Sequence, residues 1–305
     1  MTQRDVFWAE WVKEAEKDPR MVLVTADMSA PALDDFRTNY PHRYINVGIA
    51  EQNMLLVAAG LAHEGFLPAV YAIEPFVSLR CYEQWKSVVC LMKLPILGVG
   101  VGAGVSYEDS GPTHHSIEDL AIMRVLPNMV VYNPGVVRDV LSLLQRARIR
   151  QDNNLPSYIR LDRMENTEVI TGYEKAQHAH GYSAYHFAEP VPSTRQWATI
   201  IATGSMLSIA CTAAKGKNVL VINVTEFPIK FDIPVPSNYP ILVLEENSML
   251  GGLYSAVQEA CSGREMEHYA LSNYYSSPYQ YTRQAILDDN HLTVKEIQSW
   301  LKSVL

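Results

Sequence analysis

The amino-acid sequence predicts an α/β protein of two domains, each a mainly parallel β-sheet flanked by helices. Short runs rich in β-branched and aliphatic residues alternate with longer helix-like segments, which is the pattern of strands joined by crossover helices. The alternation stops in a polar stretch rich in His, Pro and Tyr and resumes at Trp197. We therefore expect a first domain over 1–164, a linker with some local strand character over 165–195, and a second domain over 196–305.

The individual elements follow from hydrophobic periodicity and from Gly or Pro at their ends. In the first domain the expected strands are Met21–Ala26, Tyr44–Val47, Leu67–Ile73, Ile96–Val101, Met129–Tyr132 and Ser157–Leu161. The expected helices are 5–17, Met54–Ala62, Pro75 to about Met92, Ser116–Arg124 and Val136–Ala147. In the second domain we expect strands from Trp197, Asn218 and Ile241, and helices over Leu207–Ala214, from Gly251, and over Leu292–Val304.

Composition and charge exclude several kinds of partner. The 305 residues are 48% hydrophobic and 19% charged, as in a folded globular protein. The net charge is −8 without a run of Lys or Arg, so nucleic acid and anionic membranes are poor partners. No apolar stretch reaches the ~18–20 residues that span a bilayer, and no signal peptide is expected. The four cysteines form no CxxC pair, which indicates a reducing, cytoplasmic location and no cysteine metal site.

The stretch from Asn46 to Met54 places one carboxylate, Glu51, at the head of an apolar helix, and Gly48 supplies a tight entry turn. A helix that is apolar on all sides is a buried one, so we expect Glu51 at the rim of a core. An acid in such surroundings favours its neutral form and can give a proton to a heterocycle nitrogen. The alternative is an ordinary first-turn Glu that the helix dipole stabilises.

The string Gly48-Ile-Ala-Glu-Gln-Asn-Met54 resembles the pyrimidine-binding domain of transketolases and deoxyxylulose-phosphate synthases. The resemblance covers essentially the whole chain, but it is weaker in the second domain, where Ala202–Ser205 and Glu245–Gly252 fit. It implies that thiamine diphosphate is the cofactor and that Glu51 contacts and activates its aminopyrimidine ring. Asp27, at the carboxyl end of the first strand, is implied nearby as a residue that orients the cofactor.

Phe76 and Arg80 lie one turn apart on an expected helix, and Tyr82 and Gln84 follow. An aromatic residue here can be ordinary core, but a flat ring also stacks on an aromatic face. The Arg-x-Tyr-x-Gln pattern places Phe76 where the family keeps its stacking phenylalanine, so the resemblance makes Phe76 and Arg80 cofactor-binding candidates. A second aromatic that transketolases usually keep is Ile73 here, which softens the pocket edge.

The Gly-rich segment 102–115 offers a backbone that can approach a ligand and two histidines that can move protons. A His-His pair alone is often a surface or metal-binding accident. The run Gly111-Pro-Thr-His114 and the following Ile117–Ala121 nevertheless resemble the family's loop. By that match His114 faces the cofactor's reactive carbon and moves protons on the substrate's oxygens, whereas the role of His115, at a usual Gln position, stays open.

The expected substrate site departs from that of transketolases acting on sugar phosphates. Ser110 replaces their Asp, and Gly102 and Ala32 replace the His and Ser of their phosphate site. Arg4 and Arg160 match the arginines of that site and favour an anion, although solvation or an ion pair with a nearby carboxylate would explain them equally. The substrate-binding candidates are Arg4, Ser110, His114, His115 and Arg160, and we expect an unusual acceptor such as a modified sugar.

The sequence contains no Gly-Asp-Gly motif, with which this family holds the diphosphate and its metal. The resemblance therefore implies a split transketolase whose separate N-terminal-half subunit binds the diphosphate and magnesium or calcium, in an α2β2 heterotetramer. The reaction would transfer a two-carbon ketol unit from a ketose to an aldehyde or ketone, with Glu51 and His114 as catalytic residues. Two rivals stay open: the beta subunit of a 2-oxoacid dehydrogenase, and a non-catalytic regulatory subunit of the same fold.

Overall fold

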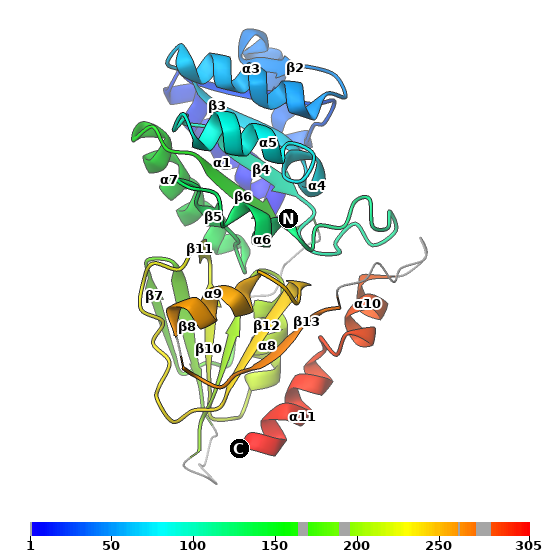
Figure 1. Ribbon diagram of the computed structural model, residues 1–305, viewed down its shortest axis with the longest axis vertical. Helices are drawn as coiled ribbons and strands as arrows, with labels where there is room; N and C mark the ends of the chain where they lie inside the picture. The colour runs from blue at the N-terminus through cyan, green and yellow to red at the C-terminus, as the bar shows by residue number, and fades with distance from the viewer. Residues whose placement is uncertain (1, 164–169, 189–195, 262, 273–281) are drawn as a thin grey trace.

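Two β-sheets, each covered by helices, organise the chain in the computed structural model, which describes residues 2–163, 170–188, 196–261, 263–272 and 282–305 (Figure 1). The two sheets lie in separate units, one above the other in Figure 1. Each sheet is mainly parallel. The predicted fold class, an α/β protein with two mainly parallel sheets flanked by helices, is confirmed.

The first sheet has the strand order β11-β5-β6-β4-β3-β1-β2. Its strands are β1 (Met21–Thr25), β2 (Tyr44–Asn46), β3 (Leu67–Ile73), β4 (Leu97–Val101), β5 (Val131–Tyr132) and β6 (Ser157–Leu161), joined by β11 (Glu226–Phe227) from the second half of the chain. All pairs are parallel except β11–β5. Strands β1, β4 and β6 are buried at every residue, as expected for parallel strands that helices cover on both faces.

Helices cover both faces of this sheet. They are α1 (Gln3–Lys17), η1 (Pro31–Leu33), α2 (Asp34–Asn39), η2 (Pro41–Arg43), α3 (Glu51–His63), α4 (Glu74–Val77), α5 (Tyr82–Gln84), the π-helical turn η3 (Trp85–Cys90), α6 (Asp119–Met123) and α7 (Val137–Asp152). One core cluster joins α1, α2 and α7 to the sheet. The other joins α3, η3 and α6 to the opposite face and continues into the second unit. This continuous apolar core holds the two units together.

The second sheet has the order β13-β12-β9-β10-β8-β7. Its strands are β7 (Lys175–Ala179), β8 (Tyr182–Phe187), β9 (Ala198–Ala202), β10 (Val219–Val224), β12 (Ile241–Ser248) and β13 (Glu267–Leu271), and its helices are α8 (Met206–Ala214), α9 (Leu253–Ala260), α10 (Arg283–Asp289) and α11 (Val294–Val304). Rather than a linker, the described part of 165–195 forms the antiparallel β7–β8 hairpin of this sheet. Because β7 is largely exposed, its residues are polar and lack a clear periodicity.

The single helix expected from Pro75 to about Met92 is instead broken into α4, α5 and η3. Side chains bond to carbonyls that a continuous helix would use for its own backbone. The indole Nε1 of Trp85 donates to the carbonyl oxygen of Val77 at 2.6 Å. The amide Nε2 of Gln52 donates to the carbonyl oxygen of Arg80 at 3.1 Å. The break therefore comes from tertiary contacts that helical periodicity does not report.

Two further features of the described chain are its lack of a membrane-spanning helix and its lack of disulfide bonds. None of the described helices has both the length and the apolar composition needed to cross a membrane. Cys81, Cys90, Cys211 and Cys261 are all free cysteines, and the first three are buried, as small hydrophobic residues often are.

Candidate functional site

The carboxyl ends of strands β2, β3 and β4 bring four of the expected site residues into one row of contacts. Glu51 follows β2, Phe76 and Arg80 follow β3, and His114 lies in the loop after β4. Because these strands are parallel, their carboxyl ends meet at one edge of the sheet, where open α/β folds bind ligands. We call Glu51, Arg80, Phe76 and His114 the contact row.

Glu51 is the first residue of α3, and its side chain is buried. The turn before it depends on Gly48, whose φ of +76° is a conformation that other residues rarely adopt. The side-chain oxygen of Asn46 accepts hydrogen bonds from the backbone N–H of Gly48 at 3.0 Å and of Asp27 at 2.9 Å. The sequence analysis assigned no role to Asn46, although an Asn two residues before a glycine is a known turn signal.

Arg80 lies between the carboxylate and the aromatic ring of the row. Its Nη1 donates to Oε1 of Glu51 at 2.7 Å, and its Cζ lies 4.0 Å from the centroid of the Phe76 ring. The Arg80 side chain is 44% exposed, whereas that of Glu51 is 6% exposed. Arg80 is therefore a half-exposed counter-ion of a buried carboxylate, a contact that the sequence analysis did not anticipate.

His114 closes the row at its other end. Its ring packs edge-on against Phe76 with centroids 5.1 Å apart, and Tyr107 lies 5.8 Å away. Nδ1 lies 2.9 Å from the hydroxyl of Thr113. Burial, followed by the nearby Arg80 guanidinium, lowers the pKa of His114 below its ordinary value of 6.5. The imidazole is accordingly neutral at pH 7 and able to accept a proton.

Three other candidates lie outside the contact row. Asp27 is exposed at a φ of +55° after β1, and its described hydrogen bonds are to Asn46. The hydroxyl of Ser110 donates to the neighbouring Asp109 at 3.3 Å. His115 is buried, its Nε2 has no hydrogen-bond partner among the described residues, and burial lowers its pKa.

The two arginines matched to a phosphate site are engaged in ion pairs. Arg160 is fully buried and donates to Asp119 through Nε at 2.7 Å and Nη2 at 2.9 Å, and to Asn247 Oδ1 at 2.7 Å. Arg4 pairs with its neighbour Asp5 at 2.8 Å. These contacts are those of the ion-pair alternative, so we do not carry Arg160 into the proposed substrate site. Its burial could not be read from the residues around it in the sequence.

The second domain holds the loop of His114 through residues that the sequence analysis did not assign. Glu246, near the end of β12, accepts from the backbone N–H of Val105 at 3.0 Å. Arg283 of α10 pairs with Glu246 at 2.6 Å and with Asp162 at 2.8 Å. Its backbone N–H donates to the Glu108 carboxylate. The Glu245–Gly252 similarity was the one sequence signal that pointed to this network.

The residues of the contact row fit the flat-ring end of a thiamine-type cofactor. They offer a buried carboxylate, an aromatic ring and a neutral imidazole. Over the described ranges of the chain, no group of three or more His, Cys, Asp or Glu is positioned to hold a metal ion. The residues that fit the cofactor are therefore those for its pyrimidine end.

Together, the fold and the contact row define a class of protein: a two-domain α/β chain with a carboxylate, an aromatic ring and an imidazole at the carboxyl ends of neighbouring parallel strands. Residues 1–168 match the family described as transketolase, pyrimidine binding domain, which is more than half of the chain. The chain belongs to this family, within the thiamine diphosphate-dependent transketolase superfamily.

Similar proteins agree with this membership. The chain is 33% identical over 290 residues to 1-deoxy-D-xylulose-5-phosphate synthase 2 of Geobacter sulfurreducens, a match that covers 92% of this chain and 44% of that protein. It is 31% identical over 269 residues to the synthase of Syntrophomonas wolfei, which covers 85% of this chain and 40% of that protein. The chain thus spans less than half the length of these relatives.

Solved structures extend the comparison. A split-gene transketolase, described as an inactive beta4 tetramer, is similar with a TM-score of 0.77 and 27% identity, over 100% of this chain and 98% of that one. A transketolase mutant from Pichia stipitis has a TM-score of 0.79 at 19% identity, over 100% of this chain and 46% of that one. At that identity the second likeness supports the fold alone.

Proposed function

We propose that this chain is the beta-type subunit of a two-component, thiamine diphosphate-dependent transketolase that is active only with a partner subunit. The observation that carries the proposal is the contact row Glu51–Arg80–Phe76–His114, in a chain of this superfamily that has the length of a split-gene transketolase chain. The reaction transfers a two-carbon ketol unit from a ketose to an aldehyde or ketone acceptor. We further propose a modified sugar as acceptor.

The chain's own residues bind, orient and move protons around the cofactor. Thiamine diphosphate, when bound, supplies the carbanion chemistry that a protein side chain lacks. Glu51 is buried at the first position of α3, and we assign it proton exchange with a pyrimidine nitrogen of the cofactor. Phe76 offers its ring for stacking. Neutral His114 takes or returns a proton at a substrate oxygen, and Arg80 balances the Glu51 charge.

The substrate side of the site is proposed from the loop after β4. Arg4 is 24% exposed. Burial raises the pKa of the Tyr107 phenol, and the charges of Arg163 and Arg4 oppose part of that rise, so Arg4 lies near the loop that carries His114. Ser110 and His115 lie in the same loop. We propose Arg4, Ser110, His114 and His115 for contacts to the substrate, and Asp27 for orienting the cofactor from the neighbouring strand end.

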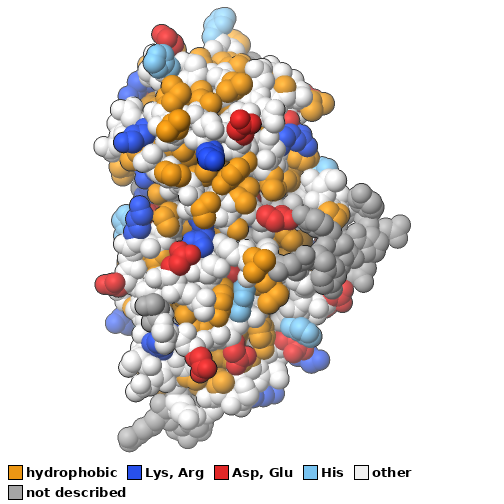
Figure 2. Space-filling view, viewed as in Figure 1, with side chains coloured by type: hydrophobic (Ala, Val, Ile, Leu, Met, Phe, Trp, Pro, Cys, Tyr) orange, Lys and Arg blue, Asp and Glu red, His pale blue; other side chains and the backbone are white. Residues whose placement is uncertain are grey.

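The partner is proposed to cover an apolar surface beside the contact row. Ile49, directly before α3, is 79% exposed, and Leu56, Leu79, Leu91 and Met92 are also exposed. Figure 2 shows hydrophobic side chains gathered over the unit that carries α3, α4 and α5 in Figure 1. Such a patch on a water-soluble surface is typical of an interface. We propose that a separate N-terminal-half subunit binds here, holds the diphosphate with magnesium or calcium, and completes an α2β2 heterotetramer in the cytoplasm.

A second candidate comes from the relatives. Their name, 1-deoxy-D-xylulose-5-phosphate synthase, gives a 1-deoxy sugar phosphate as product, and forming it by two-carbon transfer needs a unit without the hydroxyl group of a ketol. Both reactions use the same pyrimidine-end residues. The two reactions differ in the donor substrate from which the enzyme takes the two-carbon unit.

The test mixes this chain with its candidate partner, thiamine diphosphate and magnesium, and measures two-carbon transfer from a ketose. We expect no turnover from either chain alone. Glu51→Gln keeps the shape of the side chain and removes its proton, so the rate should fall by about 10²–10⁴-fold. Glu64→Gln, at the exposed other end of α3, is the matched control and should leave the rate unchanged. Full turnover by this chain alone, or by Glu51→Gln at an unchanged melting temperature, would refute the proposal.

A further inference from the structure

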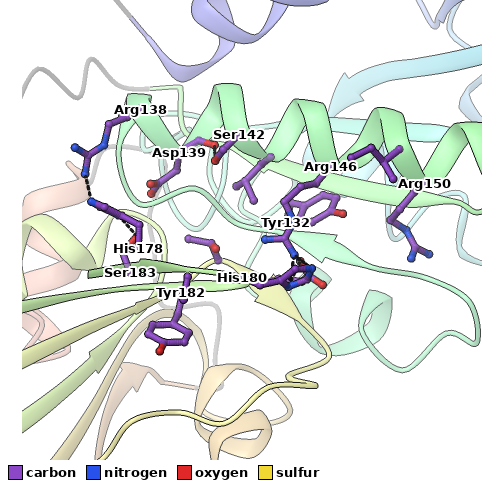
Figure 3. A pocket seen from close by; sticks show the side chains of 15 residues that line it. Tyr132, Arg138, Asp139, Ser142, Arg146, Arg150, His178, His180, Tyr182 and Ser183 are labelled. Atoms are coloured by element: carbon purple, nitrogen blue, oxygen red, sulfur yellow. Dashed lines mark hydrogen bonds and ion pairs between the residues drawn. The ribbon is translucent and has the colours of Figure 1, made fainter. Parts of the chain in front are cut away.

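A cleft of about 870 Å³ lies between the two domains. It adjoins β5 and β11 at one end of the first sheet, and β4, β3 and β2, which carry the contact row, lie farther along the strand order. Helix α7 of the first domain forms one wall, and the β7–β8 hairpin and β11 form the other (Figure 3). None of the residues that line it belongs to the contact row. Its volume lies within the range of small-molecule pockets.

Positive charge is concentrated on the helical wall of this cleft. Arg138 and Arg146 project from α7 toward the hairpin residues His178 and His180, and Arg150 lies one turn further along the helix (Figure 3). The spacing of eight and four residues places all three on one side of the helix. The whole chain has a net charge of −8, so three guanidinium groups in one cleft form a local field opposite to that of the protein.

Carboxylates compensate only part of this charge. Arg146 pairs with Glu226 of β11. Asp139 is buried and its Oδ2 accepts from the backbone N–H groups of Gly135 and Val136, so it is directed at the start of its own helix. In the part of the chain that the structure describes, neither Arg138 nor Arg150 forms an ion pair with a carboxylate.

Among the described residues, the groups that contact these two arginines are a histidine ring, a tyrosine hydroxyl and backbone carbonyls. Arg138 Nη2 lies 3.1 Å from Nε2 of His178, and Arg150 donates to the carbonyl oxygen of Pro156 at 2.8 Å. Within the described ranges, Arg138 makes its contacts through Nη2, whereas Arg150 makes its contacts through Nε and Nη2 and keeps Nη1 for a ligand. Guanidinium N–H groups recognise phosphate well. His180 also offers no negative charge to the arginines. Burial and the nearby Arg146 lower the pKa of its imidazole.

We propose that the cleft between α7 and the β7–β8 hairpin is a non-catalytic binding site for a phosphorylated small molecule. Arg138 and Arg150 are the principal anion contacts, with Arg146 between them. Because the walls come from different domains, a bound phosphate would bridge α7 and the hairpin and favour their present arrangement. The site does not depend on the proposed transketolase activity, since it shares no residue with the contact row.

The test is binding of inorganic diphosphate, ADP and ribose 5-phosphate to the purified full chain, by calorimetry at low ionic strength. We expect saturable binding that weakens as salt is added. Tighter binding of one organic phosphate than of diphosphate would support the site and identify its ligand type. Equal affinities would support a site that reads the phosphate alone. No saturable binding of any of the three at millimolar concentration would overturn the proposal.

Three variants locate the site with opposite expected signs. Arg138→Gln should weaken diphosphate binding by roughly threefold to tenfold, since one charged contact is lost. Glu226→Gln removes the carboxylate that pairs with Arg146 and should tighten diphosphate binding by a similar factor. Arg37→Gln, an exposed arginine on α2, removes the same charge elsewhere and should change nothing. Equal effects of Arg138→Gln and Arg37→Gln, or weaker binding by Glu226→Gln, would contradict the assignment. General destabilisation cannot give effects of opposite sign.

Discussion

Glu74 is a fully buried acid beside a second buried carboxylate, Asp119, and replacing it by Gln should stabilise the chain at neutral pH. The side chain is 0% exposed, and neither of its oxygens has a hydrogen-bond partner among the described residues. The nearest cation, Nε of Arg160, is 3.7 Å away and is already paired with Asp119. Burial, followed by the Asp119 carboxylate, raises the pKa of Glu74 well above its ordinary value of 4.5.

The raised pKa fixes the sign of the pH dependence. Between pH 4.5 and the raised pKa, the folded chain keeps a proton on Glu74 that the unfolded chain releases. The stability that this proton provides is fully present below pH 4.5 and is lost as the pH rises through that window. One proton corresponds to about 1.4 kcal/mol of stability lost per pH unit within that window.

Urea unfolding followed by tryptophan fluorescence at pH 5.5 and 7.5 measures this effect. Gln has the shape of the protonated acid and does not titrate, so Glu74→Gln should remove the loss and unfold at a higher free energy than the wild type at pH 7.5. Glu16→Gln, an exposed site on α1, should follow the wild type at both pH values. Parallel pH dependences for wild type and Glu74→Gln would refute the reasoning, because Glu74 would then titrate alike in both states.

Three further substitutions test buried contacts near the edge of the first sheet and the end of β12. Arg160→Met should lower the free energy of unfolding by about 3–5 kcal/mol in urea titrations, because it leaves Asp119 buried without a cation. Gly252→Ala should lower the free energy of unfolding by about 1–3 kcal/mol in the same titrations, because the added Cβ would lie 2.1 Å from Oε2 of Glu245. The Glu245 carboxylate cannot easily move away, since it accepts from two backbone N–H groups. Arg283→Met should lower the melting temperature and, in the complex with its partner, the turnover rate. A lower melting temperature with normal turnover would mean that Arg283 stabilises the fold but does not position the loop that carries His114.

The sequence predicted the parts of this fold that are determined locally. The runs at β1 and β4 consist of residues that suit strands buried on both sides, and Glu51 begins α3 directly after the turn at Gly48. The family resemblance supplied Phe76, Arg80 and His114, and the structure places all three in the contact row with Glu51. Local pattern and resemblance therefore sufficed for this part of the site.

What the sequence did not predict depends on contacts between distant segments. The β7 strand is exposed on most of its residues, so it shows no alternation and was expected as linker. β11 is a two-residue strand that exists only because β5 offers a free edge. Arg160 carries no local sign of its burial, since its partners Asp119 and Asn247 lie 41 and 87 residues away.

The end of β12 explains why the second domain bears on the site of the first. Three consecutive side chains there serve three different purposes. Glu245 accepts from the backbone N–H groups of Leu253 and Tyr254 and so caps α9. Glu246 bonds to the loop at Val105, and Asn247 accepts from Arg160 of β6. Because the last two contacts reach the carboxyl edge of the first sheet, loosening β12 should displace the loop that carries the proposed proton-transfer histidine. The second domain thus serves as a support for the site, without contributing a residue to the contact row.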